Sequence, residues 1–373
     1  MSCVFCRSND LAAESRFVAF RTVTSDVKPW RTGFGIGLCK TCGFAQSITD
    51  ENWLRSNSEI YGGYQSYYQT SDNDQVMFID GRKSNRSDLF LKACIDVGCI
   101  PKSGAALDFG CGKGTVLNAI SKIRQDLRLF GFDLDDHEVR NLQAINGFEQ
   151  LFTQDLPKSH KFDLIVMSHS LEHLSDPIEV LGDLADLLTA DGVLAIAVPD
   201  CVADPFKLLI ADHCLHFSCE SLEKLLTTAG FQVVHIESNS ESRELWAVCR
   251  FSHATKESSF KRFSNEWLPE SIDWLGQVRE HARSVMARKP FGIFGTSING
   301  VWLYGELETH VDFFVDEDPA RVDQKVFGRQ VFAPQSVPPR ASVYLPFPEP
   351  IARKIAIKLS HIDANWIIPP AFL

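Results

Sequence analysis

Apolar runs of strand length alternate with helical patterns through the middle of the chain. Residues 105–109 form a short apolar run, and apolar residues recur at helical spacing after the glycines that follow it. Six further runs have the character of strands: "LRLFGFD", "LFTQD", "KFDLIVMS", "DGVLAIAVPD", "GFQVVHIES" and "ELWAVCRFS". Because helical segments separate the earlier runs, the pattern predicts an α/β fold with a central, doubly wound, seven-stranded sheet.

A loop is expected at residues 201–217, at the carboxyl end of the fifth strand. Ser218 has the residue type of an N-cap, and the stretch after it has helical spacing. Ligands of open α/β sheets bind at the edge where the strands have their carboxyl ends. The loop contains His213 and His216, and it is therefore predicted to border a ligand site.

The carboxyl third repeats the strand–glycine–helix pattern. Residues 253–290 are predicted to be a polar linker followed by one long helix. After them, "KPFGIFGTSINGVWLYGEL" places Gly292, Gly295 and Gly300 between an apolar run and a helical run. Residues 291–373 are predicted to form a smaller Rossmann-like domain. Its glycines, spaced more loosely than a dinucleotide fingerprint, serve either strand–helix packing or nucleotide contact.

Two pairs of cysteines near the start of the chain have the spacing of a metal site. Cys3 and Cys6 form one C-x2-C pair, and Cys39 and Cys42 form the other, followed by Gly43. Four thiolates close the tetrahedral shell of zinc and leave no open position, so a structural zinc ion is predicted. A short segment with little core of its own would gain folding free energy from the metal.

A tyrosine-rich segment, "EIYGGYQSYYQT", follows this zinc-binding module and completes the part assigned to residues 1–70. It contains Tyr61, Tyr64, Tyr67 and Tyr68. Two interpretations are open: a loop that packs aromatic rings against the next domain, or a lid whose rings and hydroxyls close over a ligand.

Composition and charge restrict the expected partners and the expected cellular compartment of the protein. The net charge is −11 and no run of Lys or Arg is present, which argues against a nucleic-acid substrate. No stretch reaches the roughly 18 consecutive apolar residues of a membrane span, and the start lacks the features of a secretory signal. The eleven cysteines, an odd number, indicate a reducing compartment, so a cytoplasmic protein with no membrane partner is expected.

The glycine loop after the first strand is the most informative motif. "LDFGCGKG" places Gly110, Gly112 and Gly114 where a backbone can turn tightly and approach a ligand at a helix start. A dinucleotide site requires G-x-G-x-x-G, and here the third glycine comes one residue early. Asp108 would repel a phosphate but suits a positively charged ligand. S-adenosylmethionine (SAM), which carries a sulfonium and an ammonium but no phosphate, therefore fits better than NAD.

Three more residues are expected at the same edge of the sheet. Asp133 ends the second strand, where a carboxylate can accept both hydroxyls of a ribose. Asp155 is taken to end the third strand and to meet the adenine amino group. His169 follows the fourth strand and is assigned to the cofactor site as well.

The stretch from about residue 80 to residue 252 resembles the class I SAM-dependent methyltransferases. The resemblance rests on "LDFGCGKG", on Asp133 and Asp155, and on "SLEHLSDP" after the fourth strand. It implies a SAM-binding methyltransferase domain, which we assign to residues 71–252.

The order of the parts resembles the sugar-nucleotide C-methyltransferases of deoxysugar pathways. In that family the nucleotide sugar lies in the cleft among the three parts, and a histidine after the fifth strand removes the proton beside the sugar's keto group. The resulting carbanion attacks the methyl group. The resemblance assigns the base to His213 and the acid before it to Asp212, whereas Ile210 stands at the family's tyrosine position. O- or N-methylation of another small molecule therefore stays open.

The two histidines of the loop are given different roles. His213 is predicted to be the general base, and His216, beside the start of a helix, is predicted to position or pack, although the reverse assignment stays open. Metal binding by either is not expected, because no third or fourth ligand lies nearby in the sequence. Two other functions are less favoured: a zinc-dependent nucleic-acid methyltransferase, and an NAD(P) oxidoreductase built on the carboxyl-terminal domain.

Overall fold

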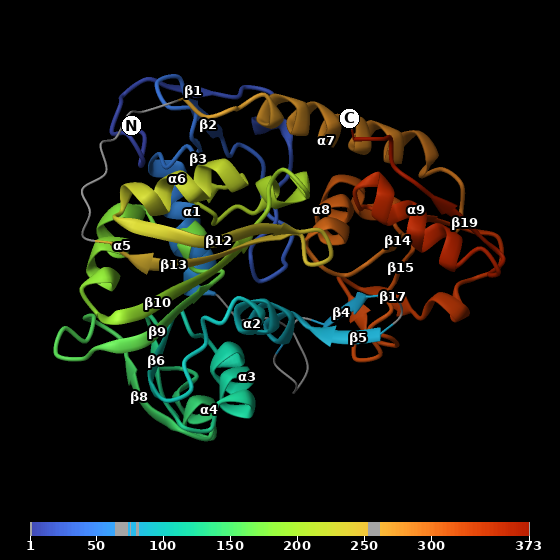
Figure 1. Ribbon diagram of the computed structural model, residues 1–373. Helices are drawn as coiled ribbons and strands as arrows, with labels where there is room; N and C mark the ends of the chain where they lie inside the picture. The colour runs from blue at the N-terminus through green and yellow to red at the C-terminus, as the bar shows by residue number, and fades with distance from the viewer. Residues whose placement is uncertain (1, 64–73, 75, 80–81, 253–261, 373) are drawn as a thin grey trace.

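The computed structural model describes residues 2–63, 74, 76–79, 82–252 and 262–372 (Figure 1). Tyr64, Tyr67 and Tyr68, three residues of the expected lid, lie outside the described residues. Within the described ranges, no helix combines the length and the apolar character that a membrane crossing requires.

A seven-stranded sheet occupies the centre of the chain, as predicted. The strand order is β12-β13-β10-β9-β6-β7-β8, and β13 alone runs antiparallel to its neighbours. The strands are β6 (Gly104–Phe109), β7 (Leu127–Phe132), β8 (Phe148–Phe152), β9 (Phe162–Ser168), β10 (Leu188–Pro199), β12 (Phe231–Asn239) and β13 (Glu244–Phe251). The third strand in sequence, β8, ends at Phe152, so the expectation that it runs to Asp155 was wrong.

Helices cover both faces of this sheet. One face packs on α2 (Arg86–Asp96) and α3 (Thr115–Ile123), and the other packs on α5 (Pro177–Ala185) and α6 (Cys219–Thr228). The short helix α4 (Val139–Gln143) lies near the edge strand β8. Ser218 caps α6: its hydroxyl accepts a hydrogen bond from the backbone N–H of Ser221, as its residue type predicts.

A small antiparallel sheet joins the start of the chain to the loop after β10. Its order is β1 (Leu11–Ala13), β2 (Ile36–Cys39), β3 (Ala45–Ser47) and β11 (Leu215–His216). The residues of β11 belong to the loop that was expected to be irregular. The loop is buried, and buried backbone groups need hydrogen-bond partners, which β3 supplies.

The carboxyl-terminal part is a second α/β unit. Its sheet has the order β16 (Lys325–Val326), β17 (Arg329–Phe332), β15 (Phe313–Val315), β14 (Phe291–Phe294), β18 (Ala341–Tyr344) and β19 (Ala364–Ile367), all parallel except β16. Helices α8 (Ile298–Leu307) and α9 (Glu349–Lys358) connect strands. A Cβ on Gly300 would lie 2.0 Å from the carbonyl oxygen of Gly295, so this glycine is needed for close packing of helix and loop.

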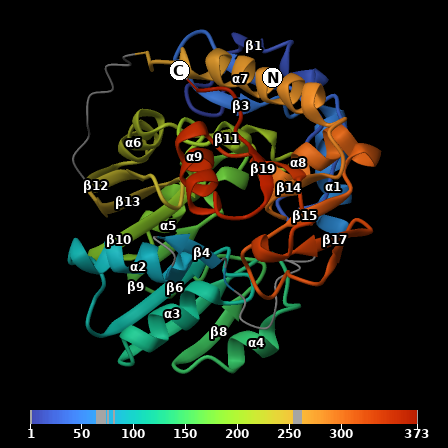
Figure 2. The ribbon, with the colours of Figure 1, turned by 90° about the vertical axis from the view of Figure 1, so that its right-hand side faces the viewer.

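The long helix α7 (Trp267–Val285) ties the ends of the molecule together. It runs past both the small N-terminal sheet and the carboxyl-terminal unit (Figures 1 and 2). One apolar cluster joins the N-terminal part, the loop after β10, α7 and the carboxyl-terminal unit. It contains Phe20, Phe206, Trp274 and Trp302, one from each of these segments in that order. The remaining described elements are α1 (Glu51–Gly62), the hairpin β4 (Val76–Ile79) and β5 (Arg82–Asn85), and short 3-10 turns that include η2 (Leu171–His173) and η3 (Pro205–Leu209).

Candidate active site

A cavity of about 1300 Å³ lies at the carboxyl ends of the central strands. Its wall is built from the glycine loop, the loops after β9 and β10, the end of α1, and the start of α8. Pockets for one small ligand typically measure roughly 300–1000 Å³. The volume is therefore sufficient for a cofactor and a second ligand.

The glycine loop forms one wall of this cavity. Gly110, Gly112 and Gly114 have φ of 79°, 45° and 78°, in the left-handed region that other residues adopt reluctantly. A Cβ on Gly110 would lie 2.7 Å from the Cβ of Ser170, whereas a Cβ on Gly112 would meet no atom within 4 Å. Gly112 therefore faces open space, where a ligand can approach the backbone closely.

Two of the predicted acids lie on this wall. Asp108 is 2% exposed, and its Oδ1 has no hydrogen-bond partner within the described residues. Burial, with a smaller effect of Asp133, raises the pKa of Asp108 to about 8. Asp133 accepts hydrogen bonds from the backbone N–H groups of Gly112 (2.7 Å) and Leu134 (2.8 Å). The unpartnered carboxyl group of Asp108 is well suited to a cationic ligand.

The two remaining predicted cofactor residues differ in position. Asp155 is exposed and does not line the cavity, because β8 ends three residues before it. His169 does line the cavity, and its Nε2 lies 2.6 Å from Oε1 of Glu244. Burial and Arg86 oppose protonation, but the carboxylates of Glu244 and Glu172 raise the pKa of His169. His169 is thus the centre of a buried ion-pair network.

His213 lies on the cavity wall and His216 does not. His213 is 3% exposed, and no described residue bonds its Nδ1. Burial, together with His173 and His216, lowers the pKa of His213 well below its usual range. The ring is therefore neutral near pH 7 and able to accept a proton. His216 is fully buried, burial lowers its pKa to about 3, and its Nε2 lies 3.1 Å from the hydroxyl of Ser47.

Residues from the start of the chain hold the loop that carries His213. The hydroxyl of Ser47 donates to the carbonyl oxygen of His213 at 2.6 Å, and the indole N–H of Trp53 donates to the carbonyl oxygen of Ala211 at 2.9 Å. The carboxylate of Asp212 is buried off the cavity wall, where it accepts hydrogen bonds from the backbone N–H (2.8 Å) and hydroxyl of Ser25. Asp212 therefore fixes the loop rather than facing the cavity.

The fold brings two further potential ligand residues to His213. Glu172, His173 and His213 each offer an atom within 4.8 Å of the others, so potential ligands that are distant from His213 in sequence lie close to it in space. Glu172 and His173 come from η2, far from His213 in sequence. Nδ1 of His173 lies 3.0 Å from the hydroxyl of Tyr61 and 3.1 Å from the carbonyl oxygen of Asp212. The motif "SLEHLSDP" contained both residues, but its spacing alone did not relate them to His213.

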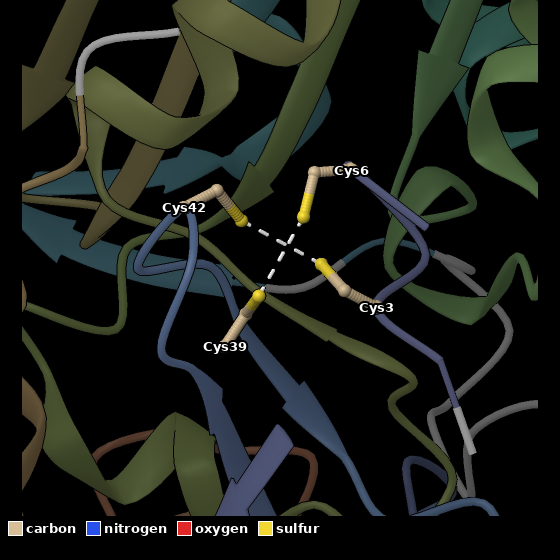
Figure 3. A group of neighbouring side chains, drawn as sticks. All are labelled: Cys3, Cys6, Cys39 and Cys42. Atoms are coloured by element: carbon tan, nitrogen blue, oxygen red, sulfur yellow. Dashed lines mark hydrogen bonds between the residues drawn. The ribbon is translucent and has the colours of Figure 1, made fainter. Parts of the chain in front are cut away.

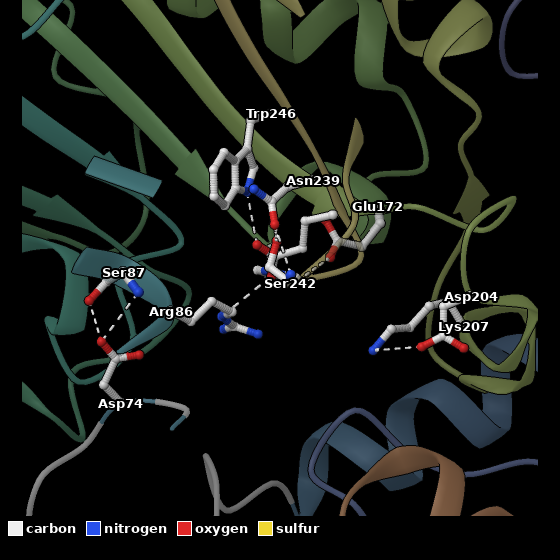
Figure 4. Close-up of polar contacts among 11 residues, drawn as sticks. Asp74, Arg86, Ser87, Glu172, Asp204, Lys207, Asn239, Ser242 and Trp246 are labelled. Carbon is white, nitrogen blue, oxygen red and sulfur yellow. Dashed lines mark hydrogen bonds and ion pairs between the residues drawn. The ribbon is translucent and has the colours of Figure 1, made fainter. Parts of the chain in front are cut away.

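Sequence reasoning missed the basic residues of the cavity. Arg86, Lys207 and Arg243 line it from α2, from η3 and from the turn between β12 and β13. Figure 4 shows Arg86 and Lys207 extending toward the same open space. Arg86 lies 3.5 Å from Glu244, and Lys207 and Arg243 lie 3.9 and 3.0 Å from Asp204. No pattern in the sequence singles out these cations, because they come from three separate segments.

The four N-terminal cysteines converge with their sulfur atoms (Figure 3). The sulfurs of Cys3 and Cys42 are 3.6 Å apart, as are those of Cys6 and Cys39. Four sulfurs at about 2.3 Å from one zinc ion would be roughly 3.8 Å apart in a tetrahedron, so the group fits zinc. The contact between Cys3 and Cys42 lowers the pKa of the Cys3 thiol and raises the pKa of the Cys42 thiol, so these two sulfurs share a proton.

Comparisons with known proteins agree with the central fold. Residues 85–236 match a family described as "Methyltransferase domain". A ubiquinone biosynthesis O-methyltransferase of Haemophilus ducreyi is 28% identical over 115 residues, which cover 28% of this chain and 49% of the relative. The chain thus spans about half the length of this curated relative.

Solved structures similar to this chain include an O-methyltransferase family protein of Burkholderia thailandensis and a SAM-dependent methyltransferase of Clostridium acetobutylicum. The first is 19% identical, covers 45% of this chain and 58% of its own, and has a TM-score of 0.37. The second is 13% identical, covers 53% and 97%, and also has a TM-score of 0.37. At TM-scores below 0.5, these similarities carry no argument about substrate or mechanism.

The family match covers the stretch that begins before β6 and ends within β12. It therefore contains Asp108, the glycine loop and Asp133, and each of these lines the large cavity. Residues 85–236 of this chain are a methyltransferase domain of the SAM-dependent class.

Proposed function

We propose that this protein transfers the methyl group of SAM to a small polar acceptor, with a nucleotide-linked keto sugar as the acceptor and a carbon atom as the site of methylation. The observation that carries the proposal is that one cavity is lined both by the glycine loop with Asp108 and Asp133 and by His213. A cofactor on the first wall and an acceptor facing His213 would share one cavity.

The residues of the cavity have separate tasks in this proposal. SAM, when bound, supplies a methyl group made electrophilic by its sulfonium. Asp108 meets the positive charge of the amino-acid part, Asp133 accepts the ribose hydroxyls, and the backbone at Gly112 allows the close approach. His213, neutral near pH 7, takes the proton from the acceptor. Alignment of acceptor and methyl group in this cavity contributes much of the rate.

The remaining predicted residues act indirectly. His169, held by Glu244 and Glu172, shapes the wall beside the cofactor, and Asp212 and His216 position the loop of His213. Cys3, Cys6, Cys39 and Cys42 hold a structural zinc ion in the proposal. All eleven cysteines are unpaired, which supports a reducing compartment and hence the cytoplasm.

The decisive experiment separates proton removal from methyl transfer. The protein, saturated with S-adenosylhomocysteine (SAH), is incubated in D2O with nucleotide-linked keto sugars, and deuterium entering the carbon beside the ketone is measured. Exchange is expected with the wild type, because His213 removes that proton without needing a methyl donor. His213→Asn should abolish exchange, whereas His216→Asn should retain it if it stays folded.

Methyl transfer from radiolabelled SAM is measured in parallel. Methyl transfer to the sugar without deuterium exchange at the carbon beside the ketone would contradict C-methylation. It would favour an oxygen or nitrogen atom as the methyl acceptor. The curated relative is an O-methyltransferase by name, and Ile210 stands where the sugar C-methyltransferases have tyrosine, so this second candidate has support of its own. Normal exchange and transfer in His213→Asn would place the base elsewhere.

A further inference from the structure

The carboxyl-terminal unit contributes the start of a helix to the cavity wall. Ser297, Ile298 and Asn299 line the cavity, and α8 begins at Ile298. The first backbone N–H groups of a helix have no partner within the helix, and the helix dipole places positive potential there. The side chain of Ser297, at the N-cap, makes no capping hydrogen bond. Donors are therefore available at this end of the cavity.

Asn299 is an independent sign of a ligand at this place. Its side chain is 3% exposed, and its Nδ2 finds no hydrogen-bond partner in the part of the chain that the structure describes. Burying an amide donor without a partner costs free energy, so such groups are normally satisfied. Since Asn299 lines the cavity, an acceptor atom of a bound molecule can satisfy it.

Two cations line the same cavity as the start of α8. Lys207 belongs to η3, and its neighbour Phe206 packs on Trp302 of α8 with ring centroids 5.4 Å apart. Ile210, just after η3, packs in one cluster with Ile298. Lys207 and Arg243 share Asp204, which is fully buried and not part of the cavity wall. Lys207 and Arg243 carry two positive charges and Asp204 carries one negative charge, so these three side chains together have a net charge of +1.

The opposite wall of the cavity has the reverse charge. Asp133, Asp135 and Glu138 line it near the glycine loop, together with one cation, Lys113. Glu244 also lines the cavity but is paired with Arg86 and His169. An anionic group is therefore repelled by the cofactor wall and attracted to the start of α8.

We propose that the start of α8, with Asn299, Lys207 and Arg243, binds a phosphate or diphosphate group of the acceptor. Backbone N–H groups, the amide of Asn299 and the ammonium of Lys207 donate to its oxygens, as helix N-termini do in other phosphate sites. The acceptor part of this inference rests on the proposed function; the binding of the anion does not. The carboxyl-terminal unit is, on this view, the part that selects phosphorylated acceptors.

The test measures anion binding by calorimetry on the full-length protein saturated with SAH. The probes are inorganic pyrophosphate and uridine diphosphate, with uridine as the uncharged comparison. Lys207→Met and Asn299→Asp should each weaken pyrophosphate binding by about tenfold or more, the usual effect of losing a hydrogen bond to a charged group. Lys113→Met is the matched control, because Lys113 lines the same cavity from the glycine loop.

The outcomes separate the subsite from the cofactor site. Wild-type binding of pyrophosphate in the presence of SAH, lost in the two variants but kept in Lys113→Met, supports the proposal. Competition between SAH and pyrophosphate, or an equal loss in Lys113→Met, would place the anion at the cofactor wall and overturn it, as would no binding of either phosphate probe by the wild type. Melting temperatures verify folding, and Lys207→Met carries the test if Asn299→Asp unfolds. If wild-type protein fails to bind SAH, the proposed function fails, and the same titrations without SAH still decide the subsite.

Discussion

At the scale of single residues, the cavity contains ionisable groups whose burial decides what they can do. Asp108 is buried without a partner for Oδ1, and its pKa is raised to about 8. The free protein therefore has a mostly protonated Asp108 at pH 7. A ligand with an ammonium group favours the ionised form, so binding and proton release are coupled.

The first prediction follows from this coupling. Binding of SAH at pH 7 should release close to one proton, because Asp108 ionises when the ammonium of SAH arrives. Calorimetry in Pipes and in Tris, whose ionisation enthalpies differ, measures the release. Asp108→Asn should bind SAH more weakly and lose this release. Equal heats in both buffers for the wild type would contradict the assignment of Asp108.

The second prediction concerns the pH dependence of turnover. His213 must be neutral to accept a proton, and its pKa lies well below its usual range. Activity is therefore fully present above that lowered pKa and is lost as the pH falls through it, so the acid limb of kcat/KM should lie below pH 6.5. His213→Asn should reduce methyl transfer about 10²- to 10⁴-fold and remove the limb. A limb at or above pH 6.5 in the wild type would contradict the buried, neutral base.

The site could be predicted where its residues are close in sequence. Asp108, the three glycines and Asp133 lie next to strand ends, so their common edge follows from the fold class. Lys207, Arg243 and Asn299 come from three distant segments. Lys207 and Arg243 meet at Asp204, and the packing of α8 on η3 brings Asn299 to the same cavity. The third strand was predicted to end at Asp155 instead of Phe152, because the end of a strand is read less securely from sequence than its existence.

At the scale of elements, long periodic segments were predictable and very short strands were not. Each of the seven central strands contains enough apolar residues to be recognised in the sequence as an apolar run of strand length. By contrast, β11 and β16 have two residues each, too few for any pattern. β11 matters for function, because its pairing with β3 aligns the loop of His213 with the N-terminal sheet.

The third prediction tests this alignment through Ser47. Its single hydroxyl hydrogen is donated to the carbonyl oxygen of His213, so Nε2–H of His216 must donate to Ser47. Ser47→Ala leaves both groups unpaired and should cost about 1–3 kcal/mol of stability. Because the loop of His213 loosens, kcat should fall while the dissociation constant of SAH stays the same.

Ser284→Ala is the control for that variant. The hydroxyl of Ser284 donates to the carbonyl oxygen of His281 on the exposed surface of α7, away from the cavity, so its loss should leave melting temperature and kcat nearly unchanged. An unchanged kcat in Ser47→Ala, together with a lowered melting temperature, would show that Ser47 stabilises the fold without positioning His213.

At the scale of the whole molecule, the parts predicted as separate domains share their cores. One apolar cluster contains cysteines of the N-terminal four-cysteine group and the residues of α5 and α6 that cover the central sheet. A second cluster joins the N-terminal sheet, α7 and the carboxyl-terminal unit. Composition and motif order predict the parts but not this contact, because interfaces between parts leave no local periodic signal.

The fourth prediction concerns the proposed zinc ion and its effect at a distance. Cys39 ends β2, β2 pairs with β3, and β3 pairs with β11 in the loop of His213. The wild type should contain about one equivalent of zinc, and Cys39→Ser should lose it, because four thiolates are needed to close the shell. Since the metal supplies folding free energy to this small module, methyl transfer should fall more than SAH affinity.

Cys249→Ser is the matched control for the loss of a buried thiol. Cys249 lies in β13, is fully buried and is outside the four-cysteine group, so this variant should keep its zinc. Elemental analysis and melting curves of the two variants compare metal content and stability directly. Full zinc content in Cys39→Ser would refute the ligand set, whereas loss of zinc with normal methyl transfer would show that His213 is held in place without the metal, by contacts such as those from Ser25 and Trp53.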